Sequence, residues 1–171
     1  GSPIGYSHYA TQLRPFTGKE WDLICGETKK IIAKATKGGY YSGLENEASC
    51  FNTHTEHMGF QVGFKEESAW RTFDRPNIPT PSNDKIELAG PMGTGVPAIN
   101  DEEISLNGKE PYDYETFRLT KQMEDNGFSF CKTEYRPYDA VVLSILWVAK
   151  QVAPNAINVS SDGGDEVIRY Y

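Results

Sequence analysis

The sequence predicts an α+β fold: a mostly antiparallel sheet covered on one face by two helices, with a C-terminal βαβ unit and a loop-rich insertion. Three observations lead to this prediction. The expected elements follow in the order strand, helix, insertion, several short strands, helix and strand. One helix is amphipathic and the other is apolar on nearly every side, so both can bury a face. The chain of 171 residues, 38% of them hydrophobic, suits a single domain over residues 3–171.

A strand and an amphipathic helix open the domain. Residues 4–13 alternate loosely, which is typical of a half-buried strand, and the strand ends before Pro15. Thr17 and Glu20 have the spacing of a capping box, and two glycines end the helix that follows. We expect its buried side chains to be those that recur at helical spacing: Trp21, Ile24, Thr28, Ile31, Ile32 and Ala35. The opposite face, with Glu27 and three lysines, is expected to meet solvent.

Residues 38–85 are predicted to be a loop-rich insertion, because Gly, Asn, Ser and Pro interrupt every regular pattern there. Alternation over residues 59–64 predicts one short strand, and residues 67–73 a second strand or a short helix. Seven aromatic residues gather in this insertion: Tyr40, Tyr41, Phe51, Phe60, Phe64, Trp70 and Phe73. Such rings either anchor an interface or form a small core under the loop, and we favour the interface.

Short strands follow the insertion. Residues 85–90 predict one strand, and residues 104–106 and 114–119 predict a hairpin with Asn107-Gly108 as its turn. The loop between them contains Gly93-Thr94-Gly95. It lacks the Gly-Lys-Ser/Thr ending and the following helix of a phosphate-binding loop, so we expect a plain connection.

The C-terminal segment predicts a strand, a buried helix and a second strand. Residues 128–131 and 156–160 are the strands, and residues 138–152 are the helix. This order is typical of a right-handed βαβ crossover with parallel strands. The ends of two parallel strands meet at one edge of a sheet, which would place Lys132 beside Asp162.

Composition narrows the setting and the partners. A formal net charge of −7 argues against nucleic acid and membrane partners, because both need cationic surface. Three widely spaced cysteines are typical of a reduced, cytoplasmic protein rather than of a disulfide-rich secreted domain. The longest apolar run, residues 140–149, is about half the ~20 residues that a membrane-spanning helix needs. No signal peptide is visible, and Gly1-Ser2 is predicted to be an expression scar.

The candidate ligand-binding residues flank the last helix. Lys132 and Arg136 precede it, and a helix N-terminus carries partial positive charge, so an anion could bind there; Ser161 and Asp162 follow the last strand. In an enzyme, Lys132 and Arg136 would hold phosphate, and Asp139 or Asp162 would act as a base or metal ligand. The alternative, which we favour, is structural: Asp139 complements the first helical turn and the two cations pair with acidic neighbours.

One cluster has the residue types of a metal site. Cys50, His54 and His57 offer three zinc ligands within a short stretch. A fourth ligand would have to come from one of three residues: Cys25, Glu56 or His8. No second ligand pair is visible, so exposed loop histidines are the favoured interpretation and no cofactor is expected. The acidic loop at Asp162 lacks the alternation of a calcium loop and is expected to be a turn.

A longer pattern resembles that of a family of small uncharacterised bacterial proteins. It runs through Phe130-Cys131-Lys132-Thr133, Arg136-Pro137-Tyr138-Asp139, an apolar helix and Val159-Ser160-Ser161-Asp162-Gly163. With earlier pieces in the same order, the resemblance covers about two thirds of the chain and skips the insertion. It implies the domain boundaries and the importance of the turn at residues 131–139. It implies no mechanism, because that family has no established activity.

We therefore predict a soluble cytoplasmic domain that binds a protein partner or a small anionic ligand, through the insertion and the turn at residues 132–139. The alternative is a hydrolase or transferase acting on a phosphorylated or nucleotide substrate. A third interpretation is an assembly subunit that forms homo-oligomers through the insertion. The sequence contains no complete catalytic or metal constellation, and this favours binding.

Overall fold

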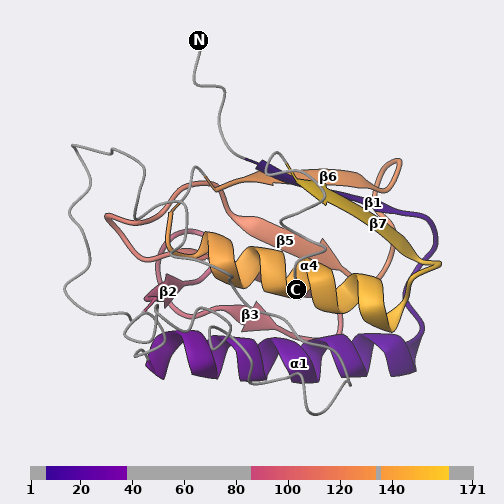
Figure 1. Ribbon diagram of the computed structural model, residues 1–171, viewed down its shortest axis with the longest axis horizontal. Coiled ribbons are helices and arrows are strands. Elements are labelled where there is room, and N and C mark those ends of the chain that lie inside the picture. The colour runs from indigo at the N-terminus through magenta and orange to yellow at the C-terminus, as the bar shows by residue number, and fades with distance from the viewer. Residues whose placement is uncertain (1–6, 38–85, 134–135, 162–171) are drawn as a thin grey trace, which may run out of the picture.

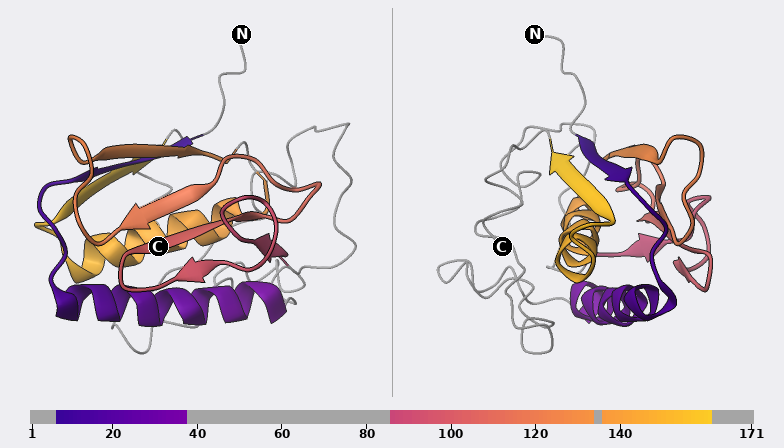
Figure 2. Two further views of the ribbon diagram at one scale, coloured as in Figure 1. Left: turned by 180° about the vertical axis from the view of Figure 1, so that it is seen from behind. Right: turned by 90° about the vertical axis from the view of Figure 1, so that its right-hand side faces the viewer.

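A computed structural model describes residues 7–37, 86–133 and 136–161 of the chain. The described elements occur in this order: β1 (Ser7–Gln12), α1 (Gly18–Lys37), β2 (Leu88–Ala89), β3 (Ala98–Ile99), β4 (Glu103–Gly108), β5 (Phe117–Thr120), β6 (Phe128–Lys132), α4 (Asp139–Val152) and β7 (Ile157–Ser161). Every strand pair is antiparallel, and both helices lie on the same side of the strands (Figures 1 and 2). The predicted α+β class is confirmed. The strands and helix expected within residues 38–85 lie outside the described residues.

β1 is the central strand of a three-stranded sheet and pairs with β6 on one edge and β7 on the other. Both pairs are antiparallel, so β6 and β7 run parallel to each other, and α4 connects them as the sequence predicts (Figure 1). The two strands are not neighbours, however, because β1 lies between them. Two antiparallel ladders on β1 are slightly more stable per residue than a direct parallel pair would be.

β4 pairs with β2, β3 and β5. The prediction that Asn107-Gly108 forms a turn is wrong, because both residues belong to β4 and are buried opposite β2. Asn107 instead closes the loop that follows: its Oδ1 accepts from the backbone N of Tyr114 at 3.0 Å, and its Nδ2 donates to the carbonyl of Tyr114 at 2.9 Å. Gly108 serves close packing, since a Cβ there would lie 2.3 Å from the carbonyl oxygen of Tyr112.

The capping box predicted at the start of α1 is present. The backbone N of Thr17 donates to Oε1 of Glu20 at 2.9 Å, and the N of Glu20 donates to Oγ1 of Thr17 at 3.1 Å. Most of the predicted buried face is confirmed: Trp21, Ile24, Thr28, Ile31 and Ala35. Glu27, predicted to meet solvent, is buried. It lies three residues after Ile24 and so on the same face, and its carboxylate is 3.4 Å from Nζ of Lys30.

α4 forms the apolar centre of the fold. It lies between the β6-β1-β7 sheet and α1 (Figure 1). The largest fully buried side chains come from both helices and from the strands around them: Trp21, Tyr138, Ile24, Ile31, Ile86, Ile104, Leu106, Leu143, Ile145, Leu146 and Ile157. Neither described helix combines the length and the apolar character that crossing a bilayer requires. The β6-β1-β7 sheet thus has an inward face against α4 and an outward face that no described helix covers (Figure 2).

Candidate functional site

A buried polar network occupies the turn that the sequence predicts to be important. Asp139, the first residue of α4, is buried, and its Oδ1 accepts a hydrogen bond from Oγ1 of Thr133 at 2.6 Å. The same oxygen contacts Nε2 of His8, whose side chain has no exposed surface. The carboxylate at the start of α4 is therefore held inside the protein, in agreement with the structural interpretation.

Sequence reasoning places His8 only as a remote zinc ligand, and in the structure it belongs to this network. His8 is 131 positions from Asp139 in the chain, yet the two side chains meet because β1 enters the sheet between β6 and β7. The available signal is the alternation along the strand, which places His8 and Gln12 on the same side. Both are buried, whereas Tyr9, on the opposite side, is less buried. A histidine at an inward strand position needs a buried polar partner, and Asp139 supplies one.

Cys131, Tyr138 and the carbonyl oxygen of Glu115 extend the network. The hydroxyl of Tyr138 donates to that oxygen at 2.5 Å and the thiol of Cys131 at 3.5 Å. Burial raises the pKa of the Cys131 thiol to about 12 and raises the pKa of Tyr138 as well. Such a thiol is protonated at neutral pH, so it is a poor nucleophile even though His8 and Asp139 lie nearby. The Cys, His and Asp side chains form a structural group here.

The cationic candidates do not join Asp139. Lys132 follows the buried Cys131 in β6, so its side chain points to the outward face of the sheet. The guanidinium of Arg136 lies 4.7 Å from the centre of the Tyr114 ring. The described structure therefore does not gather the three candidates at one anion site.

The other end of the predicted site is described as far as Ser161. His8 is the register partner of Cys131 in β6 and of Ser161 in β7. The ends of β6 and β7 thus lie at the same end of the sheet, with β1 separating them. Asp162 lies outside the described residues, so its adjacency to Lys132 stays a prediction.

The zinc candidates Cys50, His54 and His57 also lie outside the described residues. Within the part of the chain that the structure describes, no group of three or more His, Cys, Asp or Glu residues could hold a metal ion. Cys25 is a free thiol in α1, with Sγ 3.9 Å from the carbonyl oxygen of Asn100, and burial raises its pKa to about 11. The expectation about zinc stays a prediction.

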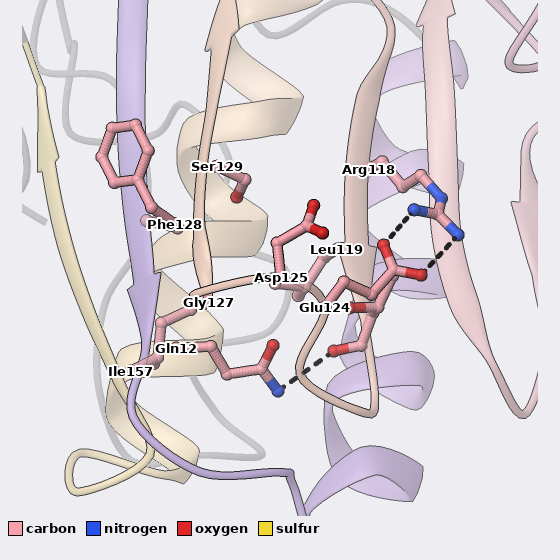
Figure 3. Close-up of a pocket in the computed structure, with 11 residues that line it drawn as sticks. Gln12, Arg118, Leu119, Glu124, Asp125, Gly127, Phe128, Ser129 and Ile157 are labelled. Atoms are coloured by element: carbon pink, nitrogen blue, oxygen red, sulfur yellow. Dashed lines mark hydrogen bonds and ion pairs between the residues drawn. The ribbon is translucent and has the colours of Figure 1, made fainter.

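A cavity of about 180 Å³ lies between β5 and β6, two strands that share no ladder in the described chain (Figure 3). Several of its polar side chains, among them Arg118, Glu124 and Gln12, are already paired. Arg118 binds Glu103 at 2.5 Å and also Glu124, and Nε2 of Gln12 donates to the carbonyl of Lys121 at 3.1 Å. A ligand would have to displace these pairs, so we interpret the cavity as a solvated gap between the two sheets.

The outward face of β1 and β6 carries three aromatic rings. The ring centres of Tyr9, Phe128 and Phe130 lie 6.4, 6.5 and 6.3 Å apart. Phe128 is 50% exposed and Phe130 is 55% exposed, although phenylalanine is among the residues most often buried. Lys132 is the next outward residue of β6. We call Tyr9, Phe128, Phe130 and Lys132 the aromatic face.

Comparison with known proteins assigns no function. The chain matches no protein-family model, no curated protein and no solved structure. The family resemblance seen in the sequence therefore stays a prediction. The functional argument rests on the buried network and the aromatic face.

Proposed function

We propose that the chain is a binding domain whose recognition surface is the aromatic face. The observation that carries this proposal is the exposure of Phe128 and Phe130 beside Tyr9, on a sheet face without a covering helix in the described chain (Figure 2). The ligand is proposed to bring a planar or apolar group to the rings and negative charge to Lys132. This keeps the binding function predicted from the sequence, and it moves the surface from the insertion to the sheet.

The exposure of these rings carries an energetic cost that a ligand would offset. An aromatic side chain buries about 150–250 Å² when covered, and burial of apolar surface contributes about 25 cal/mol per Å². A half-exposed phenylalanine thus forgoes about 2 kcal/mol. Single exposed rings are common on protein surfaces, whereas contiguous apolar patches mark sites of interaction. The three rings of the aromatic face are contiguous, which supports a binding role.

The proposed setting is the reducing cytoplasm. Cys25 and Cys131, the two cysteines in the described residues, are free thiols. Burial raises the pKa of both thiols, which makes them slow to oxidise. The support for this setting is the cysteine spacing in the sequence.

The enzymatic alternative, a hydrolase or transferase for phosphorylated substrates, has no comparable support. Lys132, Arg136 and Asp139 lie in three different surroundings, and none of them lines the cavity of Figure 3. Phosphate transfer needs cations and a base that converge on one reacting group. We therefore propose binding alone.

An NMR titration tests the proposal. We expect indole-3-acetate, a planar ring with a carboxylate, to shift the backbone amide signals of residues 9–11 and 128–132. Acetate, which has the charge but not the ring, should leave them unchanged. The double variant Phe128→Thr/Phe130→Thr should lose the response to indole-3-acetate. Shifts confined to other elements, with the aromatic face silent, would overturn the proposal.

A further inference from the structure

The turn that leads into β6 and the strand β4 share one chemical feature. Each contains an Asn-Gly dipeptide, Asn126-Gly127 in the turn and Asn107-Gly108 in β4, and the sequence has no other. In such a pair the backbone nitrogen of glycine attacks the side-chain carbonyl of asparagine with little hindrance, because glycine has no side chain. The fold holds the two dipeptides with different firmness, so they should differ in reactivity.

We propose that Asn126 is a site of spontaneous deamidation, in which its own side chain and one water molecule are the reactants. The nitrogen of Gly127 bonds to Cγ of Asn126 and loses its proton. The bond from Cγ to Nδ2 breaks, and Nδ2 gains a proton and leaves as ammonia, so a cyclic imide remains. Water then opens the imide at either carbonyl and gives aspartate or isoaspartate. No oxidation and no ligand are involved, so the reaction does not depend on the proposed function.

The conformation of the turn brings the reacting atoms together. Oδ1 of Asn126 accepts a hydrogen bond from the backbone N of Phe128 at 3.0 Å. The ring that this bond closes contains both Cγ of Asn126 and the backbone N of Gly127. The N–H of Phe128 also faces the oxygen on which negative charge develops during the attack, and it stabilises that charge. Asn126 is exposed, so water and hydroxide reach its side chain.

Local opening of the turn controls the rate. The N–H of Gly127 donates to the carbonyl of Glu124 at 2.8 Å, and it must leave this oxygen to lose its proton. Residues 122–126 are exposed, and exposed turns open at a lower free energy than strands in a core. The carbonyl of Gly127 accepts separately from N of Gln12 at 2.8 Å. The turn can therefore open while β6 stays paired with β1.

Asn107 is the protected counterpart. It is 5% exposed, and its side-chain amide is held at both ends. Oδ1 accepts from N of Gly108 at 2.7 Å and from N of Tyr114 at 3.0 Å, and Nδ2 donates to the carbonyl of Tyr114 at 2.9 Å. The backbone of Asn107 and Gly108 is also paired with β2. Reaction at Asn107 would require β4 to separate from these partners, so its rate should follow unfolding of the core.

Isoaspartate at position 126 would alter the start of β6. It adds a methylene carbon to the main chain directly before Gly127, where a Cβ would already lie 2.3 Å from the carbonyl oxygen of Gln12. It also converts the side-chain carbonyl that accepts from N of Phe128 into a main-chain group. We therefore expect isoaspartate to loosen the first pairs between β1 and β6. Both products add a negative charge to a turn that is already acidic.

Mass spectrometry of peptides from the aged full-length chain tests the inference. During incubation in mildly alkaline buffer, we expect the mass increase of deamidation at Asn126, with separate aspartate and isoaspartate peptides. Asn107 should react at least about tenfold more slowly in the folded chain. In denaturant, where neither dipeptide is held, the two rates should be similar. Equal rates in the folded chain would contradict the inference, and so would a folded chain in which neither site reacts while the denatured chain does.

Two variants separate the reaction from its effect on β6. Asn126→Gln keeps the amide but would have to close a larger ring, so it should not deamidate, and its NMR spectrum should not change with age. Asn126→Asp, measured fresh, has the added charge without the longer main chain. The amide signals of Gln12 and Phe128 should shift further in the aged wild type than in this variant. Signals in the aged wild type that match those of the fresh protein would disprove the effect on β6.

Discussion

The inward and outward faces of the β6-β1-β7 sheet are built from alternate residues of the same strands, and they differ in almost every property. Inward, His8 and Cys131 lie opposite each other and are buried with Asp139 under the sheet. Outward, Tyr9 and Phe130 lie opposite each other, and Phe130 is exposed. The buried polar network thus lies inside the sheet, and the cluster of Tyr9, Phe128 and Phe130 rings lies outside it.

This inversion separates stability from recognition. A buried polar network contributes specificity to the fold only when each member has a partner, and losing one member leaves the others unsatisfied. Exposed rings contribute little to folding and remain available to a ligand. We therefore expect inward changes to alter the free energy of unfolding and outward changes to alter binding.

The largest effect is expected at Asp139. Asp139→Ala removes the acceptor that His8 and Thr133 share, and it should lower the free energy of unfolding by about 3 kcal/mol, as breaking a buried pair does. Chemical denaturation followed by circular dichroism measures the change. Asp22→Ala, at an exposed position of α1, is the matched control and should change it by less than about 0.5 kcal/mol. Equal effects would mean that the inward network has no structural role.

The sequence predicts features that depend on neighbouring residues better than features that depend on residues far apart in the chain. The capping box at Thr17 and the strand containing Phe128 depend on neighbouring residues, and the structure confirms both. The pairing of His8 with Asp139 spans 131 positions, so it follows only from the insertion of β1 between two strands that the sequence predicts to be adjacent.

The aromatic face could be predicted in part. Alternation identifies Phe128 and Phe130 as lying on one side of their strand, but period-two patterning does not say which side is buried. Hydrophobicity alone would place both rings in the core. The inward side of β6 is marked by the buried Cys131, whose register partner in β1, His8, comes from a distant part of the chain. The sequence therefore predicts a binding surface in the aromatic insertion, which lies outside the described residues, and the exposed rings of the sheet become visible only in the structure.

The next effect concerns Gly127, which fixes where β6 begins against β1. Its φ is +83°, and a Cβ there would lie 2.3 Å from the carbonyl oxygen of Gln12. Gly127→Ala should cost about 2 kcal/mol, because both the backbone and the contact resist a side chain. Gly26→Ala is the matched variant: nothing lies within 4 Å of its Cβ position in α1, so it should stabilise by about 0.5–1 kcal/mol. If both variants changed the free energy of unfolding in the same direction, the close approach of Gly127 to the carbonyl oxygen of Gln12 would be contradicted.

A smaller effect is expected at alkaline pH. Burial raises the pKa of Cys131 from 9.0 to about 12, so the folded state keeps this proton when the unfolded state loses it. The stability that this difference contributes is fully present below pH 9 and is lost as the pH rises toward 12. Cys131→Ala lacks this loss. The difference in unfolding free energy between the wild type and this variant should therefore shrink above pH 9, by at most about 1.4 kcal/mol per pH unit. If the difference in unfolding free energy stayed constant with pH, the Cys131 thiol would not be buried in the folded state.

The smallest effect on folding is expected on the outward face. Phe130→Thr keeps a β-branched side chain in the strand and removes a ring that is 55% exposed. It should cost less than about 1 kcal/mol, the range of a cross-strand pair. Phe117→Thr, in β5, is the matched control. Phe117 is 3% exposed, so this variant should cost about 3 kcal/mol, as cavity formation does. If Phe130→Thr destabilises as much as Phe117→Thr, the outward rings belong to the core, and the separation of stability from recognition fails.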